Sequence, residues 1–173
     1  MKRIISGLII FIIIITAGLL IFGMTGKVQK NKDLEQRIKK LPVFSFMTLT
    51  GESFNSADIR SGPVLVVRFH PECEHCRYEI SEIMESDLPL SGTKIILVSN
   101  AEKDTVKNFL RQFDLSAYPN IKTLIDPSFK FGELFGSNVI PGNFLYNKDL
   151  DLIKAFNGEV KTETILKYLK DGE

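Results

Sequence analysis

Two cysteines separated by two residues are the part of this sequence best suited to chemistry. The chain has 173 residues but only two cysteines and two histidines, and three of these four lie within Cys73-Glu74-His75-Cys76. The β-branched run Val64–Phe69 precedes this segment, and apolar residues at helical spacing follow it. Two thiols at this spacing lie on one helical turn, close enough to form a disulfide. The pattern therefore predicts thiol–disulfide exchange.

The position of the pair at a helix start predicts a separate role for each thiol. The free N–H groups and the dipole at a helix N-terminus favour negative charge, so Cys73 is expected to attack a partner disulfide as a thiolate. Cys76, one turn further along, is expected to resolve the resulting mixed disulfide. A protonated His75 would stabilise the thiolate, whereas Glu74 would oppose it.

Metal binding and an inert buried pair are the two alternatives to redox chemistry. A structural zinc site needs four ligands, and four candidates lie within seven residues: His70, Cys73, His75 and Cys76. A single backbone turn seldom surrounds a metal with a tetrahedron of ligands. Redox chemistry is therefore favoured, and no metal site is predicted.

From residue 42 the sequence alternates between strand and helix patterns. Strands are expected near residues 44–49, 64–69, 94–99, 121–125, 144–146 and 152–156. Helices are expected near 73–86, 102–113, 126–136 and 162–170. This order predicts an α/β domain with a mixed sheet covered on both faces. Arg68 and His70, beside the motif, are predicted to be structural, with Arg68 leaving the edge of the sheet.

The first 41 residues have a different composition. Residues 4–24 carry no charge, and about 31 Å of helix would match the ~30 Å hydrocarbon core of a bilayer. An uncleaved transmembrane anchor in residues 1–26 is favoured over a signal peptide, because no A-x-A-like cleavage site follows the apolar stretch. Residues 27–41 are predicted to be a polar linker, and residues 42–173 the folded domain. A net charge of +1 excludes a strongly basic nucleic-acid binder.

With its strand, cysteine pair and helix in this order, the chain resembles the membrane-anchored TlpA/ResA-like thiol–disulfide oxidoreductases. These proteins have the thioredoxin fold and belong to the redoxin (AhpC/TSA-type) superfamily. The resemblance runs from about Pro42 to Lys170, and residues 42–52 are similar to the family's opening hairpin. It implies a three-layer α/β/α domain with a mixed central sheet, an N-terminal β-hairpin and an inserted strand–helix unit.

The resemblance also implies further site residues. Pro141 stands where the family carries a cis-proline, so the backbone of Ile140 is expected to face the sulfurs and a bound substrate chain. Glu79, three residues past Cys76, matches the buried acid that assists proton transfer, although a solvated helix glutamate is an equal alternative. A Cys73–Cys76 disulfide is expected in the oxidised protein, and no cofactor is implied.

The sequence departs from related patterns at several positions. Glu72 replaces the aromatic residue that usually precedes the first cysteine, and Gly142-Asn143 replaces the threonines common after the proline. Peroxidase activity is not expected, because the motif P-x-x-x-T-x-x-C would need proline at Val66 and threonine at His70. A copper- or zinc-handling chaperone of the thioredoxin fold is the alternative function, but such chaperones carry C-x-x-x-C and a distant histidine.

The expected function is therefore disulfide exchange with exported proteins, with reduction of their disulfides favoured over oxidation. Its partners would be client thiols and disulfides, a membrane or exported electron donor, and the lipid bilayer around residues 4–24. Basic residues are more numerous after the apolar stretch than before it, which by the positive-inside rule favours a cytoplasmic domain. The cysteine chemistry favours a single-pass inner-membrane protein whose domain faces the periplasm or the cell exterior.

Overall fold

The computed structural model describes residues 36–172, and within them strands and helices alternate. The strands are β1 (Ser45–Thr48), β2 (Ser53–Asn55), β3 (Val64–Phe69), β4 (Lys94–Ser99), β5 (Ile121–Ile125), β6 (Gly142–Tyr146) and β7 (Leu152–Asn157). The α-helices are α2 (Glu74–Glu85), α3 (Lys103–Leu110), α4 (Phe131–Phe135) and α5 (Thr162–Asp171). Short 3-10 helices cover Ser56–Asp58, Leu88–Leu90 and Leu115–Ala117.

The seven strands form one mixed sheet in the order β2-β1-β5-β4-β3-β6-β7. Strands β3, β4 and β5 run parallel, whereas β6 is antiparallel to β3 and β7 is antiparallel to β6. Strands β1 and β2 form the expected N-terminal hairpin. Two strand–helix pairs, β4–α3 and β5–α4, lie between α2 and β6. The predicted α/β fold with a mixed sheet is confirmed.

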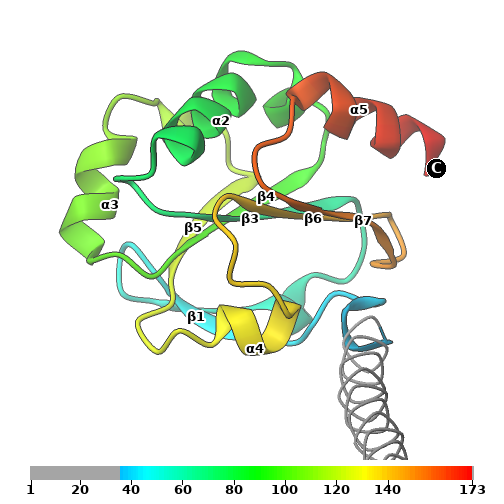
Figure 1. Cartoon of the computed structure of the whole chain (residues 1–173), viewed down its shortest axis with the longest axis horizontal. Helices are drawn as coiled ribbons and strands as arrows, with labels where there is room; N and C mark the ends of the chain where they lie inside the picture. The colour runs from blue at the N-terminus through cyan, green and yellow to red at the C-terminus, as the bar shows by residue number, and fades with distance from the viewer. Residues whose placement is uncertain (1–35, 173) are drawn as a thin grey trace, which may run out of the picture. The chain divides into compact units, whose positions relative to one another are not determined.

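Helices cover both faces of the sheet, with α2 and α5 on one face and α4 on the other (Figure 1). Strand β3 is buried along its whole length, as its near-continuous apolar run predicts. Leu65, Val67 and Phe69 of β3 share one hydrophobic core with Ile80 of α2 and Ile165 of α5. Because α2 follows β3 directly and packs on this core, the start of α2 is held beside the carboxyl end of β3.

Aromatic rings fill the space between the sheet and α4. Phe131 and Phe135 of α4 stack with ring centroids 4.3 Å apart, and the Phe135 ring lies 4.9 Å from that of Phe144 on β6. Phe44, just before β1, reaches the same cluster, 5.8 Å from Phe135. This packing fixes α4 and therefore the loop that leads from α4 into β6.

Helix α4 begins later than the sequence pattern predicts. The expected start was Asp126, but the helix starts at Phe131. The Asp126 carboxylate instead accepts hydrogen bonds from the backbone N–H groups of Lys130 (3.1 Å) and Phe131 (2.7 Å). The Asp126 carboxylate therefore caps α4 from five residues upstream, across a loop of four residues.

The N-terminal part of the described chain packs against the domain. Ile38 is buried, and the Lys40 ammonium lies 2.8 Å from the Asp151 carboxylate. Residues 37–173 form one compact unit. The predicted anchor at residues 4–24 and most of the predicted linker at 27–41 lie outside the described residues. Between residues 36 and 172, no helix is both long and apolar enough to span a membrane.

Candidate active site at the start of helix α2

Cys73 occupies the N-cap of α2, immediately after the loop that leaves β3. Its backbone N–H donates to the His70 carbonyl (3.0 Å), and its carbonyl accepts from the N–H of Arg77 (3.0 Å). The Cys73 side chain makes no capping hydrogen bond and is partly exposed. A sulfur in this position can meet an incoming disulfide while lying next to the free N–H groups of the first turn.

Cys76 lies within the first turn of α2 and is fully buried. Burial first, and then the neighbouring Cys73 and Glu79, together raise the pKa of the Cys76 thiol to about 12, against a lowering by the hydrogen bond with the His70 backbone. Both cysteines are free thiols in this structure. The two sulfurs therefore differ as predicted from the sequence, one accessible and one shielded.

Glu79 is buried on the inner face of α2, one turn after Cys76. Its Oε1 accepts hydrogen bonds from Asn143 Nδ2 and from the Val160 backbone N–H, each 2.9 Å long. Burial raises the pKa of Glu79 to about 7, opposed by these two hydrogen bonds and assisted by the charge of Glu159. A carboxyl group with this pKa can both take and give a proton at neutral pH.

Asn143, the partner of Glu79, was not predicted as part of this site. It lies on β6, opposite Val67 of β3, and it is completely buried. Sequence spacing cannot reveal this contact, because 64 residues separate the two partners. The sequence signal is an amide directly before the apolar run 144–146, since a polar side chain beside a buried strand needs a partner.

His75 pairs with a residue from the far end of the chain. Its Nδ1 lies 2.8 Å from Oε2 of Glu159, in the connection between β7 and α5, and both side chains have access to solvent. Glu159 precedes Val160, whose N–H holds Glu79. Two consecutive residues, Glu159 and Val160, therefore contact the exposed His75 and the buried Glu79 respectively. The sequence pattern identified neither of the two.

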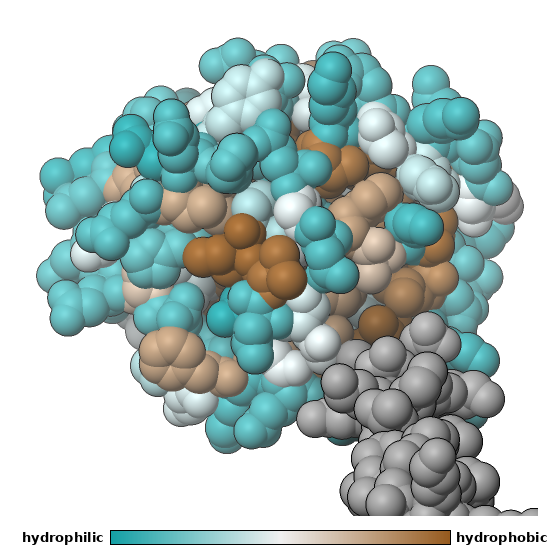
Figure 2. Space-filling view, in the orientation of Figure 1, coloured by the Kyte–Doolittle hydropathy of each residue, from teal (hydrophilic) through white to brown (hydrophobic). Residues whose placement is uncertain are grey.

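The Ile140–Pro141 peptide bond is cis, as predicted. Pro141 precedes β6, whose first residue, Gly142, pairs with Arg68 near the end of β3. The loop before β6 therefore lies at the same end of the sheet as the cysteines. In this loop Val139 and Ile140 expose 45% and 38% of their surface. Figure 2 shows a group of hydrophobic side chains among hydrophilic ones on the visible face of the molecule.

The predicted exit of Arg68 from a sheet edge is wrong, because β3 is an inner strand of the sheet. The Arg68 side chain is buried on the α4 side, where its guanidinium lies over the Phe131 ring. It donates hydrogen bonds to the Ser137 carbonyl (3.1 Å) and to Asn138 Oδ1 (2.6 Å). Arg68 therefore fixes the loop that carries Ile140, which is a structural role. His70 Nδ1 accepts from the Glu72 N–H (3.3 Å).

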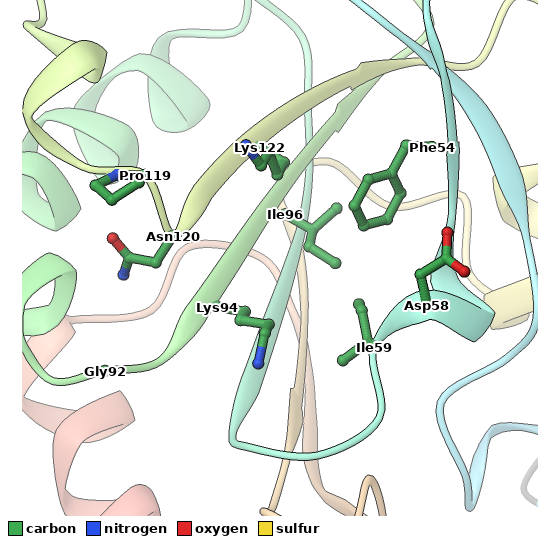
Figure 3. A pocket seen from close by; sticks show the side chains of 9 residues that line it. All are labelled: Phe54, Asp58, Ile59, Gly92, Lys94, Ile96, Pro119, Asn120 and Lys122. Carbon is green, nitrogen blue, oxygen red and sulfur yellow. The ribbon is translucent and has the colours of Figure 1, made fainter.

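Within residues 36–172, no three His, Cys, Asp or Glu side chains are grouped so that they could hold a metal ion. A cavity of about 290 Å³ exists, lined by Phe54, Asp58, Ile59, Gly92, Lys94, Ile96, Pro119, Asn120 and Lys122 (Figure 3). Lys94 is the first residue of β4, so the cavity lies at the opposite end of the parallel strands from Cys73. Its lining includes neither cysteine nor Glu79.

The mixed sheet, the paired thiols at the start of α2 and the cis-proline before β6 define a thioredoxin-like protein. The AhpC/TSA family model matches residues 38–155, more than half of the chain. The protein belongs to the AhpC/TSA family. Among curated protein sequences no match was found.

Several solved structures share this fold. A putative thioredoxin from Neisseria meningitidis is 20% identical, with a TM-score of 0.63 over 76% of this chain and 87% of that one. A putative thiol:disulfide interchange protein DsbE from Chlorobium tepidum is 17% identical, with a TM-score of 0.65 over 78% and 95%. StoA from Bacillus subtilis is 18% identical, with a TM-score of 0.57 over 73% and 95%.

Proposed function

We propose that this protein is a thiol–disulfide oxidoreductase that uses Cys73 as the attacking thiol and Cys76 as the resolving thiol. The observation that carries the proposal is the contrast between the two sulfurs. Cys73 is accessible at the helix N-cap, while Cys76 is buried one turn along, beside a carboxyl whose pKa is about 7. A catalyst of disulfide exchange needs one thiolate that reaches the client and a second thiol that reacts only afterwards.

The reaction proceeds in two exchanges. The Cys73 thiolate attacks one sulfur of the client disulfide, the client S–S bond breaks, and the other client sulfur leaves as a thiolate. The Glu79 carboxylate then takes the proton of the Cys76 thiol. The Cys76 sulfur attacks Cys73, the client's second sulfur leaves, and a Cys73–Cys76 disulfide remains. Two electrons have passed to the client, and an external dithiol must restore them.

The proposed direction is reduction of the client. A strongly oxidising pair is one whose reduced form is specially stabilised. Burial and neighbouring groups raise the pKa of Cys76 to about 12, so the protein does not stabilise its thiolate. His75, the one basic side chain between the cysteines, is held by Glu159. These features favour a pair that gives its electrons away.

We further propose that the clients are exported proteins and that the domain faces the periplasm or the cell exterior. The apolar residues 4–24 would anchor it in the inner membrane, and an exported or membrane dithiol would supply electrons. A reporter enzyme that is active only outside the cytoplasm, fused after Glu173, should be active. If instead only a reporter enzyme that works in the cytoplasm were active after Glu173, the proposed orientation would be wrong.

Substrate contact is assigned to the loop before β6. Val139 and Ile140 are exposed at the end of the sheet that carries the cysteines. The Arg68 guanidinium fixes this loop by a hydrogen bond to the Ser137 carbonyl. A client segment in extended form could lie along Ile140 with its disulfide over Cys73. Peroxidase activity is not proposed, because Val66 and His70 stand in place of the proline and threonine of the peroxidatic motif.

Trapping of the mixed disulfide tests the proposal in cells. Cys76→Ser leaves Cys73 able to attack but removes the resolving thiol, so client proteins should remain attached through a bond that dithiothreitol breaks. Cys73→Ser is the matched control and should trap nothing. Equal trapping by both variants, or trapping by Cys73→Ser alone, would contradict the assigned roles.

A further inference from the structure

Two buried oxygens at the proposed site have no hydrogen-bond partner: Oε2 of Glu79 and Oδ1 of Asn143. The two residues are almost completely buried, at 1% and 0% exposed. A buried acceptor without a donor costs free energy and needs an explanation. The two unpartnered oxygens belong to side chains that are already joined through their other polar atoms, at 2.9 Å.

The orientation of the Asn143 amide follows from its other contacts. Its Nδ2 lies 2.9 Å from Glu79 Oε1 and 3.4 Å from the Gly158 carbonyl oxygen. The Gly158 carbonyl can only accept, so the atom of Asn143 that faces it must be the nitrogen. Both N–H groups are thereby engaged, and Oδ1 is the atom left to meet a donor.

A protonated carboxyl group supplies the missing donor. A carboxylic acid and a primary amide present complementary edges, because the amide N–H can bond the acid's carbonyl oxygen while the acid's O–H bonds the amide oxygen. The first of these two bonds is already formed between Asn143 and Glu79. One proton on Oε2 would convert the two unpartnered oxygens into a donor and an acceptor.

We propose that Asn143 is a positioning residue for Glu79, and that Asn143 Oδ1 accepts a hydrogen bond from the Oε2–H group that Glu79 carries after taking the proton of Cys76. The two N–H groups of Asn143 hold the amide in register throughout, one on Oε1 and one on the Gly158 carbonyl. This inference rests on the proposed exchange reaction and explains how a buried carboxyl serves it. Sequence patterns gave Asn143 no such role.

The proton balance involves only groups that are present at the site. The Cys76 thiol gives its proton to the Glu79 carboxylate, which leaves a Cys76 thiolate and a neutral Glu79 joined twice to Asn143. Besides Cys76 on α2, the charged group that acts on Glu79 is Glu159 in the β7–α5 connection, while the Val160 N–H holds Oε1. Glu159 favours the protonated carboxyl, as does the hydrogen bond proposed here.

Equilibrium unfolding of the full-length reduced protein at pH 8.5 tests the pairing directly. Glu79→Gln replaces Oε2 by an amide nitrogen that always donates, so it should satisfy Asn143 Oδ1 and raise the denaturant midpoint above that of the wild type. In a protein that already carries Asn143→Leu, the same Glu79→Gln substitution should not raise the denaturant midpoint. No gain from Glu79→Gln, or a gain that Asn143→Leu leaves intact, would overturn the proposal.

A kinetic measurement keeps the proposal testable if Asn143→Leu does not fold. Release of the client thiol from a mixed disulfide on Cys73 is followed against pH in Asn143→Ser, with exposed Asn108→Ser as control. Asn143→Ser removes a charge-assisted hydrogen bond to the ionised Glu79 carboxyl and a neutral hydrogen bond from the protonated carboxyl. The first loss is the larger, so the pH midpoint of release should rise by about one unit. Asn108→Ser should leave both this midpoint and the rate of the first attack by Cys73 unchanged.

The outcomes separate this inference from the proposed function. A midpoint in Asn143→Ser equal to that of the wild type would overturn the role of Asn143, even where Glu79→Gln abolishes the pH dependence. Failure of Cys73 to form any mixed disulfide would instead overturn the proposed function. The unfolding experiment at pH 8.5 would then still decide whether the amide and the carboxyl are paired.

Discussion

At the scale of single residues, the site depends on unequal access to two thiols. Cys73 is partly exposed, whereas Cys76 is buried and its pKa is raised to about 12. A short iodoacetamide pulse on the reduced protein should therefore alkylate Cys73 first throughout pH 5 to 9, since only the thiolate reacts. Mass spectrometry of the digested protein measures the order, and earlier labelling of Cys76 would reverse the assigned roles.

Glu79 predicts a pH dependence of stability. Its pKa rises from 4.5 to about 7 on folding, so between these values the folded state binds more protons than the unfolded state. The free energy of unfolding should fall as the pH rises through this window, by up to roughly 3 kcal/mol, and then level off.

Chemical denaturation from pH 4 to 9 measures this effect, with Glu79→Gln as the matched variant. The variant has no titrating group at this position, so the fall attributed to Glu79 should be absent from its profile. Parallel profiles for the two proteins would show that Glu79 does not titrate inside the fold.

Local sequence patterns could predict how the two cysteines differ, but not which distant residues surround them. The chain order of Cys73 and Cys76 and the helix that begins between them predicted one accessible and one shielded thiol, as observed. Asn143 and Glu159 reach the site only because β6 and the β7–α5 connection fold back against α2. Contacts of this kind depend on the pairing of distant strands, which spacing along the chain does not encode.

At the scale of elements, buried strands were easier to predict than helix starts. The apolar runs of β3 and β4 mark strands buried inside a sheet, and both were placed at their observed bounds. Helix α4 was expected from Asp126, because aspartate before proline is typical of a helix start. Its side chain instead bridges a loop to the backbone of Lys130 and Phe131, an interaction that residue types alone do not distinguish from a direct N-cap.

The same contact predicts the effect of a substitution on α4. Asp126→Ala removes both capping hydrogen bonds inside the fold and should lower the free energy of unfolding by about 1–3 kcal/mol. Denaturant unfolding measures the loss. Asp104→Ala, in the exposed first turn of α3, is the matched control and should change stability by less than about 0.5 kcal/mol. Similar losses in both variants would contradict a specific role for Asp126.

At the scale of the whole molecule, the core is built from Ile38 onward. A chain of residues 27–173 should therefore unfold at the same denaturant concentration as the full-length protein. A chain that starts at residue 43 loses buried Ile38 and the Lys40–Asp151 ion pair, and it should be less stable by about 1–3 kcal/mol. Equal stability of the two shortened chains would show that residues 37–42 contribute nothing to the fold.

Turnover of a disulfide by the purified protein is the most direct test of the central claim that Cys73 and Cys76 exchange disulfides. The measurement follows reduction of a small neutral disulfide, with dithiothreitol as electron source, for the wild type, Cys73→Ser and Cys76→Ser. The wild type should accelerate the reaction, and Cys73→Ser should be indistinguishable from dithiothreitol alone. Turnover by Cys73→Ser at the wild-type rate would contradict the account, because Cys76 would be the only thiol left in the chain.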